Sequence, residues 1–133
     1  MIRNVYFSHR MWTIASRALA KLARVVGCTM GPAGKNVLVR NNSGVLISTK
    51  DGVTVAREYE PLDPLERTFC DFALEAATKT VVAAGDATTA AIVLVDEMVK
   101  RGRRYLTHGG NEVEFLRGFD RGIELVIQEL KQL

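Results

Sequence analysis

Apolar residues recur at the three- and four-residue spacing of an amphipathic helix in four long segments, spanning about residues 9–26, 64–84, 88–106 and 111–130. Gly27 is suited to the C′ position of the first helix, and Asn111 and Glu114 have capping-box spacing at the last. The predicted inner faces are Trp12, Ala15, Leu19, Leu22, Ala23 and Val26, then Leu65, Phe69, Phe72, Ala73, Ala76 and Ala77, and finally Phe115, Phe119, Ile123, Val126, Ile127 and Leu130.

Alternation of apolar and polar positions predicts strands near the start of the chain. Asn4–Ser8 indicates a short N-terminal strand, and VLVRNNSGVLIST predicts a β-hairpin around Asn41-Asn42-Ser43-Gly44. Lys50–Glu58 opens with a turn signal. The expected fold class is therefore mainly α (α+β), a helical bundle with a small β-hairpin and an N-terminal strand.

Charge is distributed unevenly along the 133 residues, although the net charge is only +3. Residues 1–50 hold eight Lys or Arg and no acid, whereas the remainder is net acidic. A basic first third suggests an anionic ligand, an acidic neighbour or a targeting peptide, and the alternative is that the two parts pair inside one fold.

The targeting alternative depends on residues 8–26, which are amphipathic and free of acids, as in a mitochondrial presequence. That stretch leads directly into a Gly/Pro loop and a hairpin, which favours a built-in helix and a cytoplasmic protein over one of the mitochondrial matrix. Asp86 and Asp96 interrupt the best candidate for a membrane span, so no membrane partner is expected.

The cysteines and histidines give no pattern of a metal site. Cys28 and Cys70 lack CxxC spacing and are expected to be buried free thiols in a reducing compartment. His9 and His108 are isolated in the sequence, so no His/Cys cluster is expected.

The segment AAGDATTAAIVLV places Asp86 two residues before a helix that starts near Thr88. The first-turn N–H groups of such a helix lack partners and are suited to phosphate. A carboxylate beside a bound phosphate requires a bridging cation, which predicts Mg²⁺. The alternative is simple N-capping, in which Asp86 accepts the N–H of Thr88 or Thr89, and the six residues GDATTA alone favour it.

Three other stretches carry weaker signals. TMGPAGKN is a Gly-rich loop with a lysine, but its spacing differs from a Walker A motif and it follows a helix. TKDG is most often a turn. KRGRR lies near a helix C-terminus, where cations are expected, and no aromatics interleave with it, so nucleic-acid binding is not favoured.

Taken in order, TMGPAGKNV, STKDGVTVARE and AAGDATTAAIVL resemble the three nucleotide-binding segments of the group I (GroEL-type) chaperonins. NVYFS and LRGFDRGIELVIQELKQL extend the resemblance over essentially the whole chain. It implies that residues 1–133 are the first part of the ATP-binding, ring-forming equatorial domain. The rest of that domain and the intermediate and apical domains would lie beyond residue 133, and the last helix indeed has no stop signal.

The resemblance implies an ATP-hydrolysing chaperonin subunit that assists protein folding in a ring of like subunits. Asp51 would be catalytic and orient the attacking water, Asp86 would bind Mg²⁺, and ATP would be the nucleotide. A K⁺ site would use Thr29, Lys50 and Thr89. The nucleotide-binding residues would be Thr29, Met30, Gly31, Pro32, Lys50, Gly52, Asp86, Ala87, Thr88, Thr89 and Ala90.

Three alanines depart from the family pattern. Ala87 replaces a glycine, Ala90 a threonine and Ala33 a lysine. By helix propensity, Ala87→Gly would slightly destabilise the helix start. These departures leave open an assembly protein with little or no ATPase activity, and a small basic nucleic-acid binder is a more distant alternative. Unfolded client proteins are expected partners of a chaperonin, and a lid co-chaperonin is an optional one.

Overall fold

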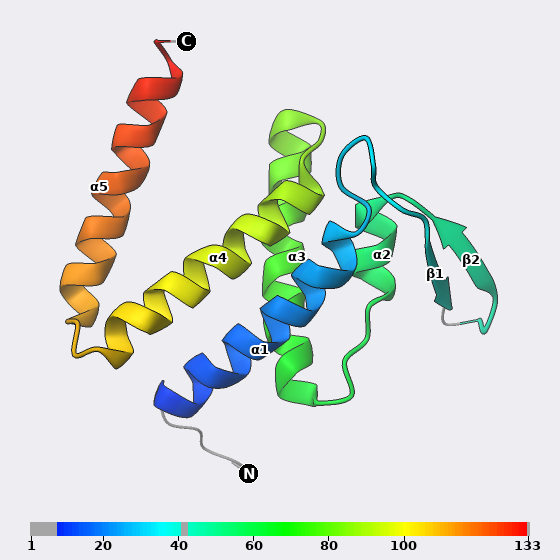
Figure 1. Cartoon of the computed structure of the whole chain (residues 1–133), viewed down its shortest axis with the longest axis horizontal. Helices are drawn as coiled ribbons and strands as arrows, with labels where there is room; N and C mark the ends of the chain where they lie inside the picture. Colours follow the sequence, from blue (N-terminus) through cyan, green and yellow to red (C-terminus); the bar gives the residue numbers. More distant parts are fainter. Residues whose placement is uncertain (1–7, 41–42, 133) are drawn as a thin grey trace. The chain divides into compact units, whose positions relative to one another are not determined.

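The computed structural model describes residues 8–40 and 43–132 (Figure 1). The elements within these residues are α1 (Ser8–Gly27), β1 (Val37–Arg40), β2 (Leu46–Thr49), α2 (Gly52–Glu58), α3 (Pro64–Ala84), α4 (Thr88–Thr107) and α5 (Glu112–Leu130). The four long helices and the hairpin confirm the predicted fold class. The predicted N-terminal strand lies outside the described residues apart from Ser8, which begins α1.

The chain divides into two compact units, Met1–Val99 and Lys100–Leu133, so that the boundary falls within α4. In the first unit, α1 packs against α3 and α2, and α2 packs against β1 (Figure 1). Four large side chains in this unit are fully buried: Leu22, Val26, Val55 and Ile92. No helix among the described residues is long and apolar enough to cross a membrane.

Helix α1 buries most of its predicted face, including Ala15, Leu19 and Ala23. The expectation that Gly27 occupies the C′ position is wrong, because Gly27 is the last residue of α1 and its φ is not positive. The chain instead leaves the helix through hydrogen bonds from Thr29 N to Val26 O (3.0 Å) and from Met30 N to Gly27 O (3.1 Å).

Helix α3 buries only part of its predicted face. Ala73 and Ala77 are buried as predicted, together with Glu66 and Cys70, whereas Phe72 is 61% exposed and Ala76 is also exposed. Small side chains on the buried face allow α1 to approach closely, and Cys70 Sγ lies 3.9 Å from the Ala18 carbonyl oxygen. In α3, small side chains and not the large Phe72 ring therefore face the partner helix α1.

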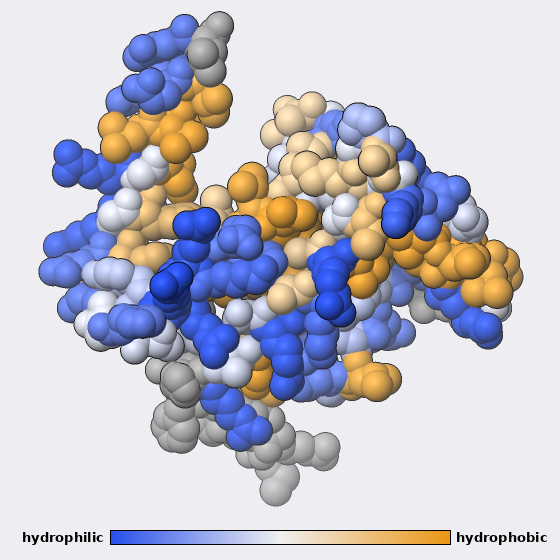
Figure 2. Space-filling view, in the orientation of Figure 1, coloured by the Kyte–Doolittle hydropathy of each residue, from blue (hydrophilic) through white to orange (hydrophobic). Residues whose placement is uncertain are grey.

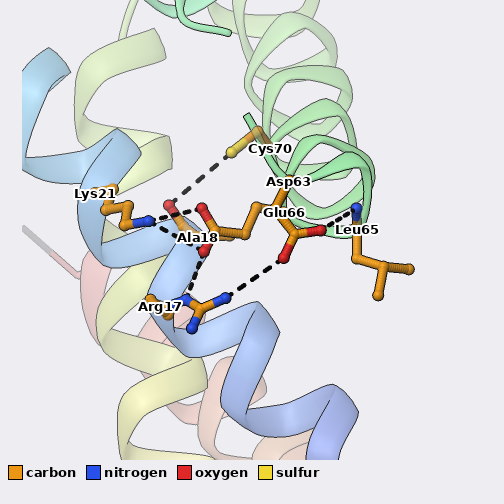
Figure 3. A network of polar contacts seen from close by, with 7 residues as sticks. All are labelled: Arg17, Ala18, Lys21, Asp63, Leu65, Glu66 and Cys70. Carbon is orange, nitrogen blue, oxygen red and sulfur yellow. Dashed lines mark hydrogen bonds and ion pairs between the residues drawn. The ribbon is translucent and has the colours of Figure 1, made fainter. Parts of the chain in front are cut away.

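A polar network joins α1 to the start of α3 (Figure 3). Glu66 is 2% exposed and accepts hydrogen bonds from Arg17 Nε at 2.5 Å and from Lys21 Nζ at 2.8 and 3.0 Å. Arg17 also reaches Asp63 at 3.5 Å. These ion pairs connect the basic first third of the chain to the acidic part, as the internal-pairing alternative predicted.

The predicted hairpin is confirmed as an antiparallel pair in which Val37 lies opposite Thr49 and Arg40 opposite Leu46. Its surface is partly apolar (Figure 2), with Leu38 71% and Leu46 60% exposed. The short helix α2, which follows β2, was not predicted from the sequence.

The second unit contains the end of α4 and all of α5. Asn111 caps α5, since its Oδ1 accepts from Val113 N at 2.8 Å and Glu114 N at 3.2 Å. Gly102 does not interrupt α4, and the Phe115 ring packs where a side chain at residue 102 would lie. Phe115 and Phe119 are partly buried. The rest of the predicted α5 face is exposed (Figure 2), at Ile123, Val126, Ile127 and Leu130.

Candidate functional site

The three stretches singled out by the sequence meet at one cleft in the first unit. They are the loop after α1, the turn between β2 and α2, and the start of α4. The cleft has a volume of about 330 Å³. Pro32 does not line it, and Val53 lines it although the sequence did not single it out. The lining residues are Thr29, Met30, Gly31, Lys50, Asp51, Gly52, Val53, Asp86, Ala87, Thr88, Thr89 and Ala90.

The start of α4 presents unpaired donors to this cleft. The first backbone bond of the helix runs from Ala91 N to Ala87 O at 2.9 Å, so the N–H groups of Thr88, Thr89 and Ala90 have no helical acceptor. Thr88 is 3% exposed, and its buried Oγ1 has no hydrogen-bond partner among the described residues. A buried polar atom without a partner is unfavourable in a folded protein unless a ligand or water satisfies it.

Asp86 does not form the N-cap of α4 that was the alternative interpretation of the sequence. Its Oδ1 accepts from Ala87 N at 2.6 Å, and neither Thr88 N nor Thr89 N bonds to it. Oδ2 makes no hydrogen bond to the described part of the chain. Ala87 has φ +83°, the left-handed region that glycine tolerates best. The exposed Asp86 carboxylate therefore keeps an oxygen available at the cleft.

Gly52 is the point at which the segments approach most closely. A Cβ at this residue would lie 3.3 Å from Val26 Cγ1 and 3.4 Å from Thr29 Oγ1, and closer still to the Thr89 hydroxyl. Thr29 is buried, and its Oγ1 donates to the Val26 carbonyl at 2.8 Å. Glycine at residue 52 is thus required for the two threonine hydroxyls to share this corner of the cleft.

Asp51 is the N-cap of α2, which gives the TKDG turn a definite structural role. Its Oδ2 accepts from Thr54 N at 2.9 Å and from Thr54 Oγ1 at 2.6 Å, and its Oδ1 accepts from Val53 N at 3.3 Å. These hydrogen bonds, that of the Thr54 hydroxyl foremost, lower the pKa of Asp51 below its ordinary value. Asp51 is consequently an ionised acceptor at neutral pH.

The basic KRGRR stretch lies in the second unit, away in sequence from the cleft residues. Arg101 and Arg104 line a shallow hollow there, together with Tyr105 and His108. Tyr105 directly follows the basic residues and does not interleave with them. It is 43% exposed, its ring stacks on Phe115 with centroids 5.8 Å apart, and the backbone of Gly110 packs against it.

The two expected buried thiols differ in environment. Cys70 is buried as predicted, whereas Cys28 is exposed and its Sγ lies 3.2 Å from the Arg24 carbonyl oxygen. Both are free. The prediction for Cys28 is wrong because this residue follows the last turn of α1, outside the packed face of the helix.

Comparison with known proteins agrees with this arrangement. Residues 22–133 match the TCP-1/cpn60 chaperonin family. The structure is similar to that of the chaperonin gp146 from the bacteriophage EL 2 (Pseudomonas aeruginosa), determined in the presence of ATP-BeFx, with a TM-score of 0.73 and 31% sequence identity. The match covers 92% of this chain and 21% of that chain, so this chain spans about a fifth of gp146. With a family match over most of its length and a chaperonin-like fold, the chain belongs to the TCP-1/cpn60 chaperonin family.

Proposed function

We propose that the cleft binds and hydrolyses Mg-ATP as part of a chaperonin folding cycle. The single observation that carries this proposal is the start of α4. Among the described residues, neither the N–H groups of Thr88, Thr89 and Ala90 nor the hydroxyl of Thr88 has a hydrogen-bond partner. Together they form a set of donors at the positive end of a 20-residue helix. Phosphate oxygens are acceptors of the kind that such a set requires.

The residues of the cleft also fit a magnesium ion. Asp86 has one carboxylate oxygen unused by the described residues, and it lines the same cleft as the phosphate donors. Carboxylates together with phosphate oxygens are the usual ligands of Mg²⁺ in proteins. When bound, Mg²⁺ would neutralise charge on the phosphates; Asp86 would hold it, and Lys50 would add a further positive charge at the cleft.

Asp51 would orient the attacking water. It lines the cleft and stays ionised at neutral pH, since its hydrogen bonds from Thr54 lower its pKa. Both carboxylate oxygens of Asp51 already accept hydrogen bonds from the first turn of α2, but each oxygen can accept more than one. Its fixed position at the α2 N-terminus would hold a water in one orientation.

A potassium ion would use oxygen atoms of Thr29, Lys50 and Thr89. The hydroxyls of Thr29 and Thr89 both lie next to Gly52. Lys50 could contribute only its carbonyl oxygen, because its ammonium would repel the cation. Met30 and Gly31 would lie along the nucleotide, whereas Pro32 is given no contact because it does not line the cleft.

Residues 1–133 would be the first part of an equatorial, ring-forming domain in a longer subunit. In this proposal the full-length protein forms a ring of like subunits and uses ATP turnover to assist the folding of client proteins. The similarity to gp146 over 92% of the chain supports this, since that protein is a chaperonin determined in the presence of an ATP analogue.

Magnesium-dependent ATP turnover by the full-length protein tests the proposal. Asp86→Ala is expected to abolish turnover while the thermal unfolding of the protein changes little, because Asp86 is exposed and bonds only to its neighbour. Asp71→Ala, at an exposed acid on α3, is the matched control and should behave as wild type. Wild-type magnesium dependence in Asp86→Ala would refute the metal assignment, and no nucleotide binding by the wild type would refute the function.

A further inference from the structure

The loop between α1 and β1 is closed on itself by backbone hydrogen bonds. Lys35 N donates to Cys28 O at 2.7 Å, which joins the two ends of the loop, and Gly34 N donates to Gly31 O at 3.0 Å within it. Thr29 is fixed twice at the base of the loop, through its own N–H and its hydroxyl, both of which donate to Val26 O. Gly34 therefore has little freedom to move away from its neighbours.

Two of these neighbours are residues of the cleft. A Cβ built on Gly34 would lie 2.2 Å from the Thr29 carbonyl oxygen and 2.8 Å from Lys50 Cε. The φ of Gly34 is not positive, so this glycine is required for space and not for backbone conformation. By contrast, a Cβ at Gly31 or Gly44 would meet no atom of the described residues within 4 Å.

The side chain of Lys50 is long and exposed, and fixing such a chain has an entropic cost of up to about 2 kcal/mol. The aliphatic part of the Lys50 side chain packs on the bare backbone of Gly34. The contact is at Cε, the carbon bonded to the ammonium nitrogen. We propose that Gly34 is a positioning residue of the cleft, which holds the Lys50 ammonium in place for an anionic phosphate. This inference rests on the proposed nucleotide function and assigns a role to a residue that does not line the cleft.

The test is a double-mutant cycle in the full-length protein, with the affinity for a fluorescent ATP analogue measured in the presence of Mg²⁺. Lys50→Ala and Gly34→Ala are each expected to weaken binding about tenfold, the loss of one charged hydrogen bond. If the two effects were independent, the dissociation constant of the double variant would rise by the product of the two single increases. It should instead be at least threefold lower than that value, because Gly34→Ala has already displaced Lys50. Gly44→Ala is the control, since it strains a left-handed glycine in open space and should leave affinity unchanged.

Losses that multiply without coupling would overturn the proposal, as would normal binding by Gly34→Ala. If Lys50→Ala weakens binding but no coupling is found, only the role of Gly34 fails. If the wild type does not bind the nucleotide, the proposed function fails and this inference fails with it.

A second measurement avoids any substitution at Gly34, where the contact with the Thr29 backbone could prevent folding. Hydrogen exchange is followed by mass spectrometry in the peptide that contains Lys35, whose N–H closes the loop. Lys50→Ala removes the stem and should speed exchange of this loop severalfold, whereas Lys50→Met keeps an unbranched stem without charge and should not. Equal exchange in both variants would contradict the packing of Lys50 on Gly34.

Discussion

Thr89 Oγ1 lies 2.0 Å from the position that a Cβ on residue 52 would occupy. The start of α2 and the start of α4 are therefore in contact through a glycine and a hydroxyl, although 37 residues separate the two positions in sequence. Because this contact is inside the cleft, a side chain at residue 52 would occupy the space of a predicted phosphate donor.

Gly52→Ala is accordingly expected to weaken nucleotide binding strongly, by at least tenfold, and to destabilise the protein by about 1–3 kcal/mol through overpacking. Gly52→Ala combined with Thr89→Ser should not recover binding, because serine retains the hydroxyl oxygen that the Cβ meets. Thr89→Ala in the Gly52→Ala background removes this clash and should restore most of the stability. Binding and chemical denaturation measured on the four proteins provide the check.

Asp51 has a structural and a proposed chemical role that two substitutions separate. Asp51→Ala removes the cap of α2 and should lower the free energy of unfolding by about 1 kcal/mol. Asp51→Asn keeps a good capping side chain and should be nearly as stable as wild type, yet slow ATP turnover at saturating nucleotide while sparing binding. Wild-type turnover in Asp51→Asn would argue against a water-orienting role.

The effect of Ala87→Gly has the opposite sign to the one expected from helix propensity. Ala87 precedes the helix and has φ +83°, so its Cβ is a source of strain and glycine should stabilise the protein by about 1 kcal/mol. Ala90→Gly is the matched control, since residue 90 is in the first turn of α4 and glycine there should destabilise it by a similar amount. Destabilisation by both substitutions in thermal denaturation would refute the strained conformation.

Glu66 should make stability depend on pH in the acid range. The hydrogen bond from Lys21, with that from Arg17, lowers the pKa of this buried carboxyl from 4.5. A lowered folded-state pKa means that the contribution is complete above the unfolded pKa and is lost as pH falls through the folded value. As the pH falls below about 5, wild type should therefore lose more stability than Glu66→Gln. Parallel pH profiles of the two proteins would show that the ion pairs are not stabilising.

The two cysteines should differ in reactivity. Burial raises the pKa of Cys70 to about 11, whereas Cys28 is exposed. Only the thiolate reacts with a disulfide reagent, so at neutral pH the native protein should be labelled rapidly at Cys28 and very slowly at Cys70. Cys28→Ser should remove the rapid phase, and a rapid phase that persisted would mean that α1 and α3 separate readily.

The four long helices and the hairpin could be predicted because their signals are local. Asn111 caps α5 with the expected spacing, and Gly85 ends α3 with φ +80°. The burial of Glu66 on α3 could not be predicted, because it depends on Arg17 and Lys21, which lie 49 and 45 residues away. The sequence pattern of α3 alone predicts that a carboxylate such as Glu66 is exposed and that Phe72 is buried. Packing against α1 gives the opposite result for both residues.

The residues of the candidate site were found through their resemblance to a family and not through their local chemistry. Locally, Asp86 resembled a helix cap. Ala87 replaces a glycine of the family pattern, but only the structure shows that it is left-handed and that its N–H donates to the Asp86 carboxylate. Val53 was missed because an apolar residue in a predicted turn carries no functional signal. Gly34 and Gly52 show their importance only when the distances to Thr29, Lys50 and Thr89 are known.

The order in which the cleft segments occur along the chain has a consequence for synthesis on the ribosome. The α1 loop and the β2–α2 turn are made first, but the donors of Thr88 and Thr89 complete the cleft only after α3 has been made. The contacts between α3 and α1 involve residues made before α4, although Ile92 of α4 later joins the same core. A nascent chain that has not yet released the start of α4 would have these residues but no phosphate donors. Nucleotide, which stabilises only the form that binds it, would therefore begin to favour the folded state only after the start of α4 has been made.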